Sequence, residues 1–306
     1  QEAENIIKNY KPEIIILGTS ENRDSFAFHL IKIARQHNIK TIGVIDSPAN
    51  APLRFKGYTN DIFAYAPDSL WVIDDLSYQE YLDLSFPSKN IKKVGHPFYW
   101  QISHQHNRLN DCQKTQLKTQ IYKTSDKVVL FLGEISAGLN DSLFQYSEQY
   151  SLHGFGNSLM RTEIVLEEVI LQLQNYSDIK LFIKPHPKDK SEYYQKYAKY
   201  INGFVGHNVD SIQSCKGADL IIGMSTSLLM EAYFAGCGVL SVLTNKDEKK
   251  WINYINETGL NCVWTRPQLA KQIRDWYIED KKISKLKPYE IPKNPISMML
   301  EDLKHV

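Results

Sequence analysis

Two short segments in the second half of the sequence contain the residues best suited to chemistry. Residues 184–187 read Lys-Pro-His-Pro and residues 225–227 read Ser-Thr-Ser, and each segment follows a short apolar run. A histidine between two prolines has few backbone conformations, and its imidazole can donate a hydrogen bond to a phosphate oxygen. The hydroxyl cluster opens a predicted helix, where free amides and the helix dipole favour an anion. The pattern predicts a phosphate site with the nucleotide-binding candidates Lys184, His186, Pro187, Ser225, Thr226, Ser227 and Glu231.

These residues also have purely structural explanations. His186 can cap a rigid turn, and one hydroxyl from the Ser-Thr-Ser cluster is enough to cap a helix. Glu231 lies about one turn into the helix, where it can accept ribose hydroxyls or simply face solvent. The dipeptide His96-Pro97 repeats the His-Pro pattern after another apolar run. The dipeptide alone therefore does not establish a ligand site.

Carboxylates at the ends of predicted strands are candidate general bases. Glu134 follows a strand and precedes a loop that contains glycine, and Asp46 has the analogous place in the first half. The glycine lets the backbone near Glu134 approach a ligand closely. The catalytic candidates are therefore Glu134, His186 and Asp46.

These candidates need strands and helices that bring them to one edge of a sheet. Short apolar runs rich in β-branched residues alternate with helical patterns through both halves of the sequence. This alternation predicts an α/β protein with parallel, doubly wound sheets. The runs before His186 and Ser225 are predicted to be adjacent strands, so that both turns lie at the same rim.

The alternating pattern occurs twice, which predicts two Rossmann-like domains facing each other across a cleft. Residues 1–105 form the predicted first domain, residues 106–280 the nucleotide-binding domain, and residues 281–306 a C-terminal tail and helix. The polar stretch at residues 103–120 is the expected link. Ligands of such sheets bind beyond the carboxyl ends of the strands, which is where the polar candidates occur.

Composition argues against several classes of protein. With 36 Lys and Arg against 35 Asp and Glu, the formal net charge is +1, which gives no indication of nucleic-acid binding. The four cysteines lie far apart without metal-ligand spacing, and we expect reduced thiols in a cytoplasmic protein. No apolar run approaches the roughly 20 residues that span a bilayer. Walker and Gly-x-Gly-x-x-Gly motifs are absent from the sequence.

The motifs resemble those of a known group of enzymes. Lys-Pro-His-Pro is followed further along by Ala-Asp-x-x-x-Gly-Met-Ser-Thr-Ser-x-x-x-Glu-Ala. This combination is similar to the C-terminal half of bacterial GT-B glycosyltransferases that use CMP-activated acidic sugars. The group contains the sialyl-, polysialyl-, Kdo and other nonulosonic-acid transferases of capsule and lipopolysaccharide synthesis.

The resemblance implies a metal-independent transferase that moves sialic acid, Kdo or another nonulosonic acid from a CMP-sugar to a glycan or lipid-linked acceptor. Glu134 or Asp46 would deprotonate the acceptor hydroxyl. His186 and the Ser-Thr-Ser helix start would stabilise the departing CMP phosphate. Arg54 and Arg161 are candidates to face the carboxylate of the donor sugar. No cofactor is implied, because the CMP-sugar is a substrate.

Other functions fit the same architecture. UDP-GlcNAc 2-epimerases and CDP-glycerol-type transferases share it, and nucleotide release from CMP-sugars against UDP-sugars would separate these enzymes. A non-catalytic subunit of a polysaccharide assembly complex would bind nucleotide without turnover. The lysine-rich segment at residues 281–287 indicates either a peripheral contact with an anionic membrane or a solvated linker.

Overall fold

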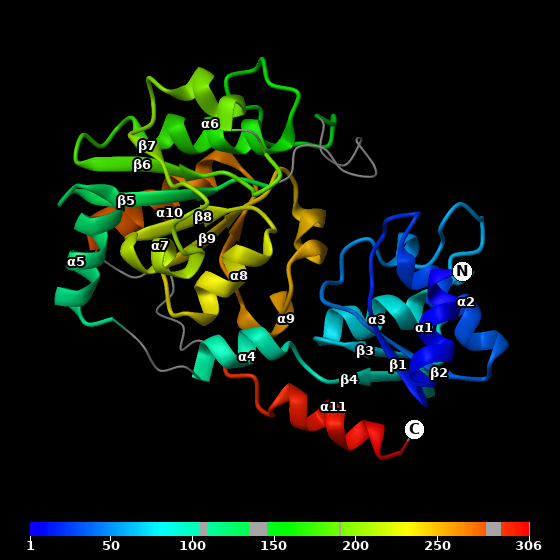
Figure 1. Ribbon diagram of the computed structural model, residues 1–306. Coiled ribbons are helices and arrows are strands. Elements are labelled where there is room, and N and C mark those ends of the chain that lie inside the picture. The colour runs from blue at the N-terminus through cyan, green and yellow to red at the C-terminus, as the bar shows by residue number, and fades with distance from the viewer. Residues whose placement is uncertain (105–108, 135–145, 190, 280–288, 306) are drawn as a thin grey trace. The chain divides into compact units, whose positions relative to one another are not determined.

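The protein folds into two compact units. The structure is a computed structural model that describes residues 1–104, 109–134, 146–189, 191–279 and 289–305. One unit comprises Gln1–Trp100 with Ile291–Val306, and the other comprises Gln101–Glu290. Each unit contains one parallel sheet with helices packed on it (Figure 1). The predicted α/β class with two Rossmann-like sheets is therefore confirmed.

The sheet of the first unit has its strands in chain order, β1-β2-β3-β4. All of its pairings are parallel. The strands are β1 (Ile14–Gly18), β2 (Lys40–Val44), β3 (Ser69–Val72) and β4 (Ile91–Lys93). The α-helices and 3-10 helices around them are α1 (Glu2–Tyr10), α2 (Phe26–Gln36), η1 (Ala51–Leu53), α3 (Asp75–Asp83), η2 (Ser88–Asn90), α4 (Pro97–His104) and α11 (Pro295–Leu303).

Two apolar layers hold this sheet between helices. On one face, Phe28 of α2 lies in the same buried cluster as Leu70 of β3. On the other face, Trp71 packs with Met298 of α11. The Trp71 indole also donates a hydrogen bond to Asp302 at 2.8 Å. The last helix of the chain therefore belongs to the first unit.

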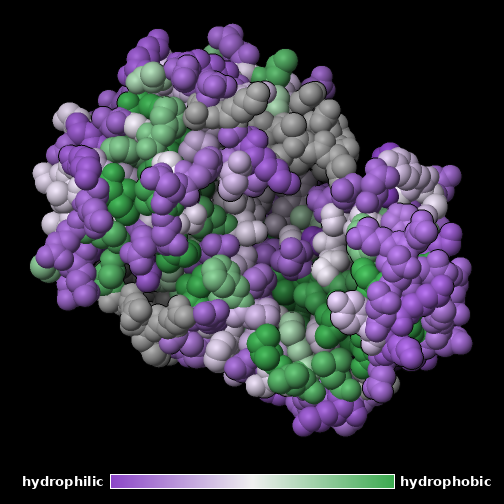
Figure 2. Space-filling model, in the orientation of Figure 1, coloured by the Kyte–Doolittle hydropathy of each residue, from purple (hydrophilic) through white to green (hydrophobic). Residues whose placement is uncertain are grey.

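Helix α11 leaves part of its apolar surface uncovered. Ile296 and Leu300 are 49% and 57% exposed, and Figure 2 shows apolar atoms where Figure 1 places α11. Residues four apart lie on the same side of a helix. The side with Met298 packs on the sheet, whereas the side with Ile296 and Leu300 does not.

The second unit has a larger parallel sheet with the strand order β10-β9-β8-β5-β6-β7. Residues 128–132 of its central strand are at most 1% exposed, as expected for a parallel sheet covered on both faces. The strands are β5 (Lys127–Leu132), β6 (Ile179–Lys184), β7 (Gly203–Phe204), β8 (Leu220–Gly223), β9 (Val239–Val242) and β10 (Cys262–Val263). The helices are α5 (Asp111–Tyr122), α6 (Arg161–Leu173), η4 (Ser191–Tyr197), α7 (Ser211–Gly217), α8 (Ser227–Phe234), η5 (Lys246–Trp251), α9 (Ile255–Thr258) and α10 (Arg266–Glu279).

The strand order creates a topological switch point between β5 and β8. From β5 the chain continues outward to β6 and β7, then returns across the sheet to β8, β9 and β10. The strands before His186 and Ser225 are β6 and β8, and the prediction that they are adjacent is wrong because β5 pairs with both of them. All three strands are parallel, so their carboxyl ends still share one edge. Ligands of doubly wound sheets bind at such a switch point.

Helices cover both faces of the second sheet. α6 packs against α10, and α7 packs against α5 and α8. Figure 1 shows these two groups on opposite sides of the strands. The predicted link at residues 103–120 contains α5, which begins at a capping box where the Gln113 amide donates to the Asn110 side chain at 2.9 Å.

The sequence predicts a tyrosine-rich helix after His186. The segment forms the 3-10 helix η4. Tyr194 and Tyr197 are 1% and 2% exposed. A 3-10 helix places residues three apart on the same side, so this geometry buries both rings together.

The structure tests the expectation about membrane-spanning segments but not the predictions that fall on undescribed residues. Among the described residues, no helix combines the length and apolar character needed to cross a bilayer. The lysine-rich segment at residues 281–287 lies outside the described residues. The loop glycine Gly138 and residues 105–108 of the predicted link also lie outside them.

Candidate functional site

The candidate site lies at the carboxyl edge of the second sheet, where β5, β6 and β8 end. The Gly133 amide donates a hydrogen bond to the Lys184 carbonyl at 2.9 Å. A Cβ atom at Gly133 would lie 2.6 Å from the Tyr194 hydroxyl and 3.3 Å from the backbone nitrogen of His186. Glycine therefore lets the end of β5 approach the His186 turn closely, and the next residue is Glu134.

Glu134 connects the end of β5 to the turn that precedes α8. Its carboxylate accepts hydrogen bonds from the Ser225 amide and, at 3.3 Å, from the Ser225 hydroxyl. The Glu134 residue is only 8% exposed. Glu134 and Ser225 follow the two strands that flank the switch point, so the structure brings these two predicted site residues into contact.

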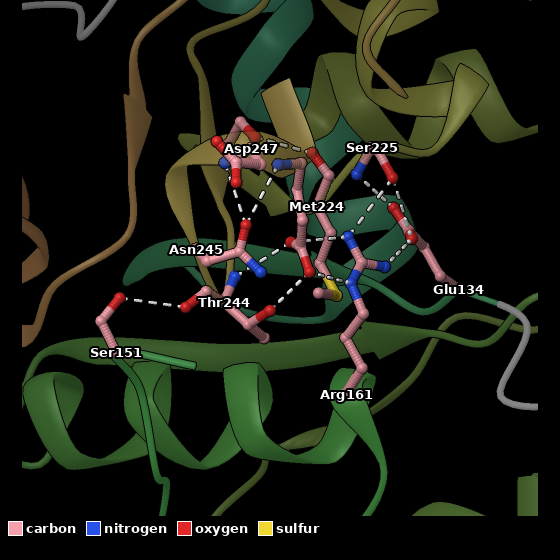
Figure 3. Close-up of polar contacts among 10 residues, drawn as sticks. Glu134, Ser151, Arg161, Met224, Ser225, Thr244, Asn245 and Asp247 are labelled. Carbon is pink, nitrogen blue, oxygen red and sulfur yellow. Dashed lines mark hydrogen bonds and ion pairs between the residues drawn. The ribbon is translucent and has the colours of Figure 1, made fainter. Parts of the chain in front are cut away.

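A buried guanidinium lies on the other side of Glu134. Arg161, the first residue of α6, donates from Nη1 to Glu134 at 2.8 Å and from Nε and Nη2 to Glu248 at 2.8 and 3.0 Å. Burial alone would lower the pKa of Arg161, but the charges of Glu134 and Glu248 outweigh burial and raise it. Figure 3 shows Arg161 directed from α6 toward Glu134 on one side and residues 244–247 on the other. Arg161, predicted to face a donor carboxylate, is ion-paired inside the protein.

His186 lies half-buried just after β6. Its Nδ1 accepts a hydrogen bond from the Lys188 amide at 3.2 Å, which assigns the proton of the neutral ring to Nε2. Burial lowers the pKa of His186, although the carboxylates of Asp189 and Glu134 oppose the shift. The imidazole is therefore neutral at pH 7 with Nε2–H as its donor. Pro187, the next residue, is exposed.

Helix α8 begins at the predicted hydroxyl cluster. Thr226 is the N-cap residue, but its hydroxyl caps no backbone amide. Within the part of the chain that the structure describes, the amides of Ser227 and Leu228 donate to no protein acceptor. Free amides at a helix start attract anions. The beginning of α8 therefore retains hydrogen-bond donors that a phosphate can use.

The remaining two nucleotide-binding candidates lie near the start of α7. Lys184 is 5% exposed, and its Nζ donates to the Val209 carbonyl at 3.2 Å. Burial lowers the pKa of Lys184, and the charge of Asp210 opposes this shift. Glu231 is half-buried on α8, and burial, followed by the charge of Asp210, raises its pKa. Lys184 thus fixes the loop before α7, and Glu231 faces the same acidic residue.

The candidates from the first half of the sequence lie in the first unit. Arg54 is 4% exposed and donates from Nη1 to Asp46 and to the Thr19 hydroxyl, both at 3.0 Å. The Asp46 side chain is 66% exposed. Arg54, also predicted to face a donor carboxylate, is therefore paired within its own unit. The roles of Asp46 and Glu134 as general bases stay predictions.

Sequence reasoning missed Glu248 and Thr244. Glu248 is 2% exposed and accepts hydrogen bonds from the Thr244 amide at 3.0 Å and the Thr244 hydroxyl at 2.5 Å. Asn245 followed three residues later by Glu248 matches the pattern of a helix start, and Asn245 does cap η5. That local signal locates a helix start but gives no sign of Arg161, which is 87 residues away in the sequence.

Glu134 and Glu248 both form ion pairs with Arg161. Among the described residues, no group of three or more His, Cys, Asp and Glu side chains could hold a metal ion. The expectation that the protein uses neither a metal nor a cofactor stays a prediction.

The fold matches solved structures of UDP-GlcNAc 2-epimerases and of proteins bound to UDP or UDP-glucose, whereas the sequence matches no family model and no curated protein. The UDP-GlcNAc 2-epimerase from Neisseria meningitidis, bound to UDP-GlcNAc, has a TM-score of 0.66 and 12% identity, covering 100% of this chain and 80% of that one. S. aureus MnaA with UDP has a TM-score of 0.64 and 13% identity, with the same coverage. Anabaena Alr3699/HepE with UDP-glucose has a TM-score of 0.62 and 10% identity, covering 99% and 82%.

These similarities overturn the CMP-sugar transferase prediction, and with it the acidic-sugar donor and the role in capsule or lipopolysaccharide synthesis. The structures that share the fold along the whole chain include UDP-GlcNAc 2-epimerases. The motif led to the wrong donor because a His-Pro turn and a hydroxyl-rich helix start are suited only to binding a phosphate. Many nucleotide sugars carry that phosphate, so the motif does not specify the base, the sugar or the reaction.

Proposed function

We propose that this protein is an enzyme that binds a UDP-sugar at the carboxyl edge of its second sheet and epimerises the sugar. The proposed substrate class is a UDP-N-acetylhexosamine. The fold neighbours support this class, since UDP-GlcNAc 2-epimerases and a HepE bound to UDP-glucose share the two-unit fold along the chain.

The observation that carries the proposal is the convergence of polar groups at the switch point. Glu134 follows β5 and contacts Ser225, which follows β8, while the Gly133 backbone lies against His186 at the end of β6. Three strand ends thereby contribute polar groups to a small area. The switch point is where doubly wound sheets hold nucleotides.

Specific donors are available there for a diphosphate. The His186 Nε2–H and the free amides of Ser227 and Leu228 are oriented by the turn and by α8. Ser225 is already engaged by Glu134, so the next hydroxyls, those of Thr226 and Ser227, are the proposed phosphate contacts. Half-buried Glu231, on the same helix, is the proposed partner of the ribose hydroxyls.

The binding half of the proposal is tested by a thermal-shift panel of UDP, UMP, CDP and CMP. A ligand that binds the folded state raises its melting temperature. We expect UDP to give the largest rise in melting temperature, because it carries both the uracil and the diphosphate of the proposed substrate. A larger shift with CMP or CDP than with UDP would contradict the proposal, and CDP would favour a CDP-glycerol-type enzyme.

The catalytic half is tested by incubating the protein with UDP-GlcNAc in D₂O. The proposed epimerisation removes the proton of carbon 2 to a base and returns a proton from solvent to the opposite face, so the epimerised product should carry deuterium at carbon 2. Proton NMR would detect both the new epimer and the loss of the signal from the hydrogen on carbon 2. UDP binding without any new epimer would instead support a non-catalytic nucleotide-binding protein.

A further inference from the structure

We propose that Glu248 is a positioning residue of this nucleotide-sugar site, acting through Arg161 and Glu134 to hold the Ser225 turn at the start of α8. The inference rests on the proposed function, because the ligand of that turn is taken to be the nucleotide diphosphate. Glu248 itself contacts neither His186 nor the free amides of α8 in the described contacts.

Glu248 is saturated with hydrogen bonds. Its Oε1 accepts from Arg161 Nε and from the Thr244 hydroxyl, and its Oε2 accepts from Arg161 Nη2 and from the Thr244 amide. A carboxylate that binds a guanidinium through two parallel hydrogen bonds fixes the plane of that guanidinium. Glu248 therefore determines where the last nitrogen of Arg161, Nη1, points.

Arg161 has little freedom to choose another orientation. Its side chain is 2% exposed, and its guanidinium carbon lies 5.1 Å from the centre of the Trp251 ring. Nη1 donates to Glu134 at 2.8 Å. The guanidinium thus transmits the position of Glu248 to Glu134, and Glu134 in turn accepts the Ser225 amide.

This relay joins residues just beyond the ends of β9, β5 and β8 across the switch point. Thr244 follows β9, Glu134 follows β5 and Ser225 follows β8. Ser225 immediately precedes Thr226, the N-cap of α8. A displacement of Ser225 therefore moves the first free amides of the helix, which are the proposed phosphate donors.

Arg161 is shared between two carboxylates, because both Glu134 and Glu248 form ion pairs with it. Without Glu248, Arg161 has only Glu134 as an ionic partner and can rotate to form two hydrogen bonds with it. That rotation would draw the Glu134 carboxylate away from the Ser225 amide. We therefore expect weaker nucleotide binding beyond any general loss of stability.

Helix α6 offers a matched control in a second Glu–Arg pair. Glu168 is 1% exposed and accepts two hydrogen bonds from Arg266, from Nε and from Nη2, both at 2.8 Å. It also accepts from the His153 and Gly154 amides. This pair resembles the Glu248–Arg161 pair in the burial of its glutamate and in its two arginine–carboxylate hydrogen bonds, although the Arg266 side chain is 51% exposed. It has no contact with Glu134 or Ser225 in the described hydrogen bonds.

The experiment compares Glu248→Gln with Glu168→Gln in the full chain. UDP affinity is measured by calorimetry and the melting temperature by thermal unfolding. We expect at least a ~10-fold loss of UDP affinity for Glu248→Gln, the size of a lost charge-assisted hydrogen bond, and less than about 2-fold for Glu168→Gln. Thr244→Val, which removes one hydrogen bond to Glu248, should weaken UDP binding to an intermediate degree and serves if Glu248→Gln does not fold.

A second readout tests the relay without ligand. In protein labelled with ¹⁵N-serine, the Ser225 amide signal, assigned from Ser225→Ala, should move in Glu248→Gln or Thr244→Val and stay in place in Glu168→Gln. If wild type binds UDP but the two glutamate variants lose affinity equally, and the Ser225 signal does not move, the positioning role is overturned. If wild type binds no UDP, the proposed function fails. If the Ser225 signal nevertheless moves in Glu248→Gln, the contact between Glu248 and the Ser225 turn is supported, but its role in UDP binding is not.

Discussion

The two units each contain a His-Pro dipeptide after a strand, and the two histidines are used differently. His96 precedes α4, stacks on Tyr99 with ring centres 3.9 Å apart, and accepts a hydrogen bond from the Tyr99 amide at its Nδ1. His186 accepts from the Lys188 amide in a turn without a following α-helix. His96 thus behaves as a capping residue of its helix. His186 lies beside the end of β5, near Glu134 and the switch point.

The comparison shows that the same dipeptide makes different contacts in different surroundings. In the first unit the imidazole closes on its own helix. In the second unit Gly133 and the Glu134–Ser225 contact bring a second and a third strand end to the turn. Variants at the two histidines test whether the two turns are as different as their contacts indicate.

The largest expected effect is a pH dependence of stability that originates at His96. Burial lowers the pKa of His96 from 6.5 to about 4. The unfolded chain therefore takes up a proton near pH 6.5, whereas the folded protein resists it until about pH 4. The contribution of neutral His96 to the free energy of unfolding is therefore fully present above pH 6.5. It is lost as the pH falls toward 4, by about 3 kcal/mol in total.

This effect is measured by urea unfolding between pH 7 and pH 4.5 for wild type and His96→Gln. Glutamine stays neutral at every pH and keeps an acceptor for the Tyr99 amide. We expect the variant to lose about 2–3 kcal/mol less than wild type over this range. Parallel profiles for the two proteins would show that His96 is not the buried capping group described here.

A smaller effect is expected on ligand binding at the other turn. His186→Ala removes the Nε2–H donor, and a hydrogen bond to a charged group contributes about 1.5–3 kcal/mol, so UDP affinity should fall roughly 10- to 100-fold. Calorimetry with UDP measures the change. His96→Gln is the control and should bind UDP as wild type does. Equal affinities for all three proteins would remove His186 from the proposed site.

The smallest expected effect concerns the helix start that accompanies His186. The Thr226 hydroxyl caps no amide, so Thr226→Ala should cost less than about 0.5 kcal/mol of stability, against about 1 kcal/mol for Asn110→Ala in the capping box of α5. UDP affinity should fall severalfold for Thr226→Ala and stay unchanged for Asn110→Ala. Urea unfolding and calorimetry on the two variants measure both quantities, and a stability loss at Thr226 equal to that at Asn110 would identify it as an ordinary cap.

Much of the local structure could be predicted from the sequence. The run at residues 127–132 is predicted as a strand and forms β5, and the helix predicted from about Ser158 to Gln174 contains α6. The short elements β7, α7 and β10 escaped prediction. A strand of two residues, such as Gly203–Phe204 or Cys262–Val263, is too short to show a periodicity.

The candidate site could be predicted only in part. The turns at His186 and Ser225 follow apolar runs and are visible as motifs, and the Glu134 position after a strand is visible in the same way. The sequence suggested Arg161 as a partner of the donor sugar's carboxylate and gave no indication of Glu248. Their contact joins residues 87 positions apart, and no local pattern reports a contact at that distance.

The sequence by itself determined most of the longer strands and helices and the polar turns that follow the strands, because periodicity and capping depend on residues a few positions apart. Only the tertiary structure decided that β5 lies between β6 and β8, that α11 packs on the first unit, and that Arg161 bridges Glu134 and Glu248. Strand order and buried ion pairs depend on how distant segments pack together, which neighbouring residues do not encode.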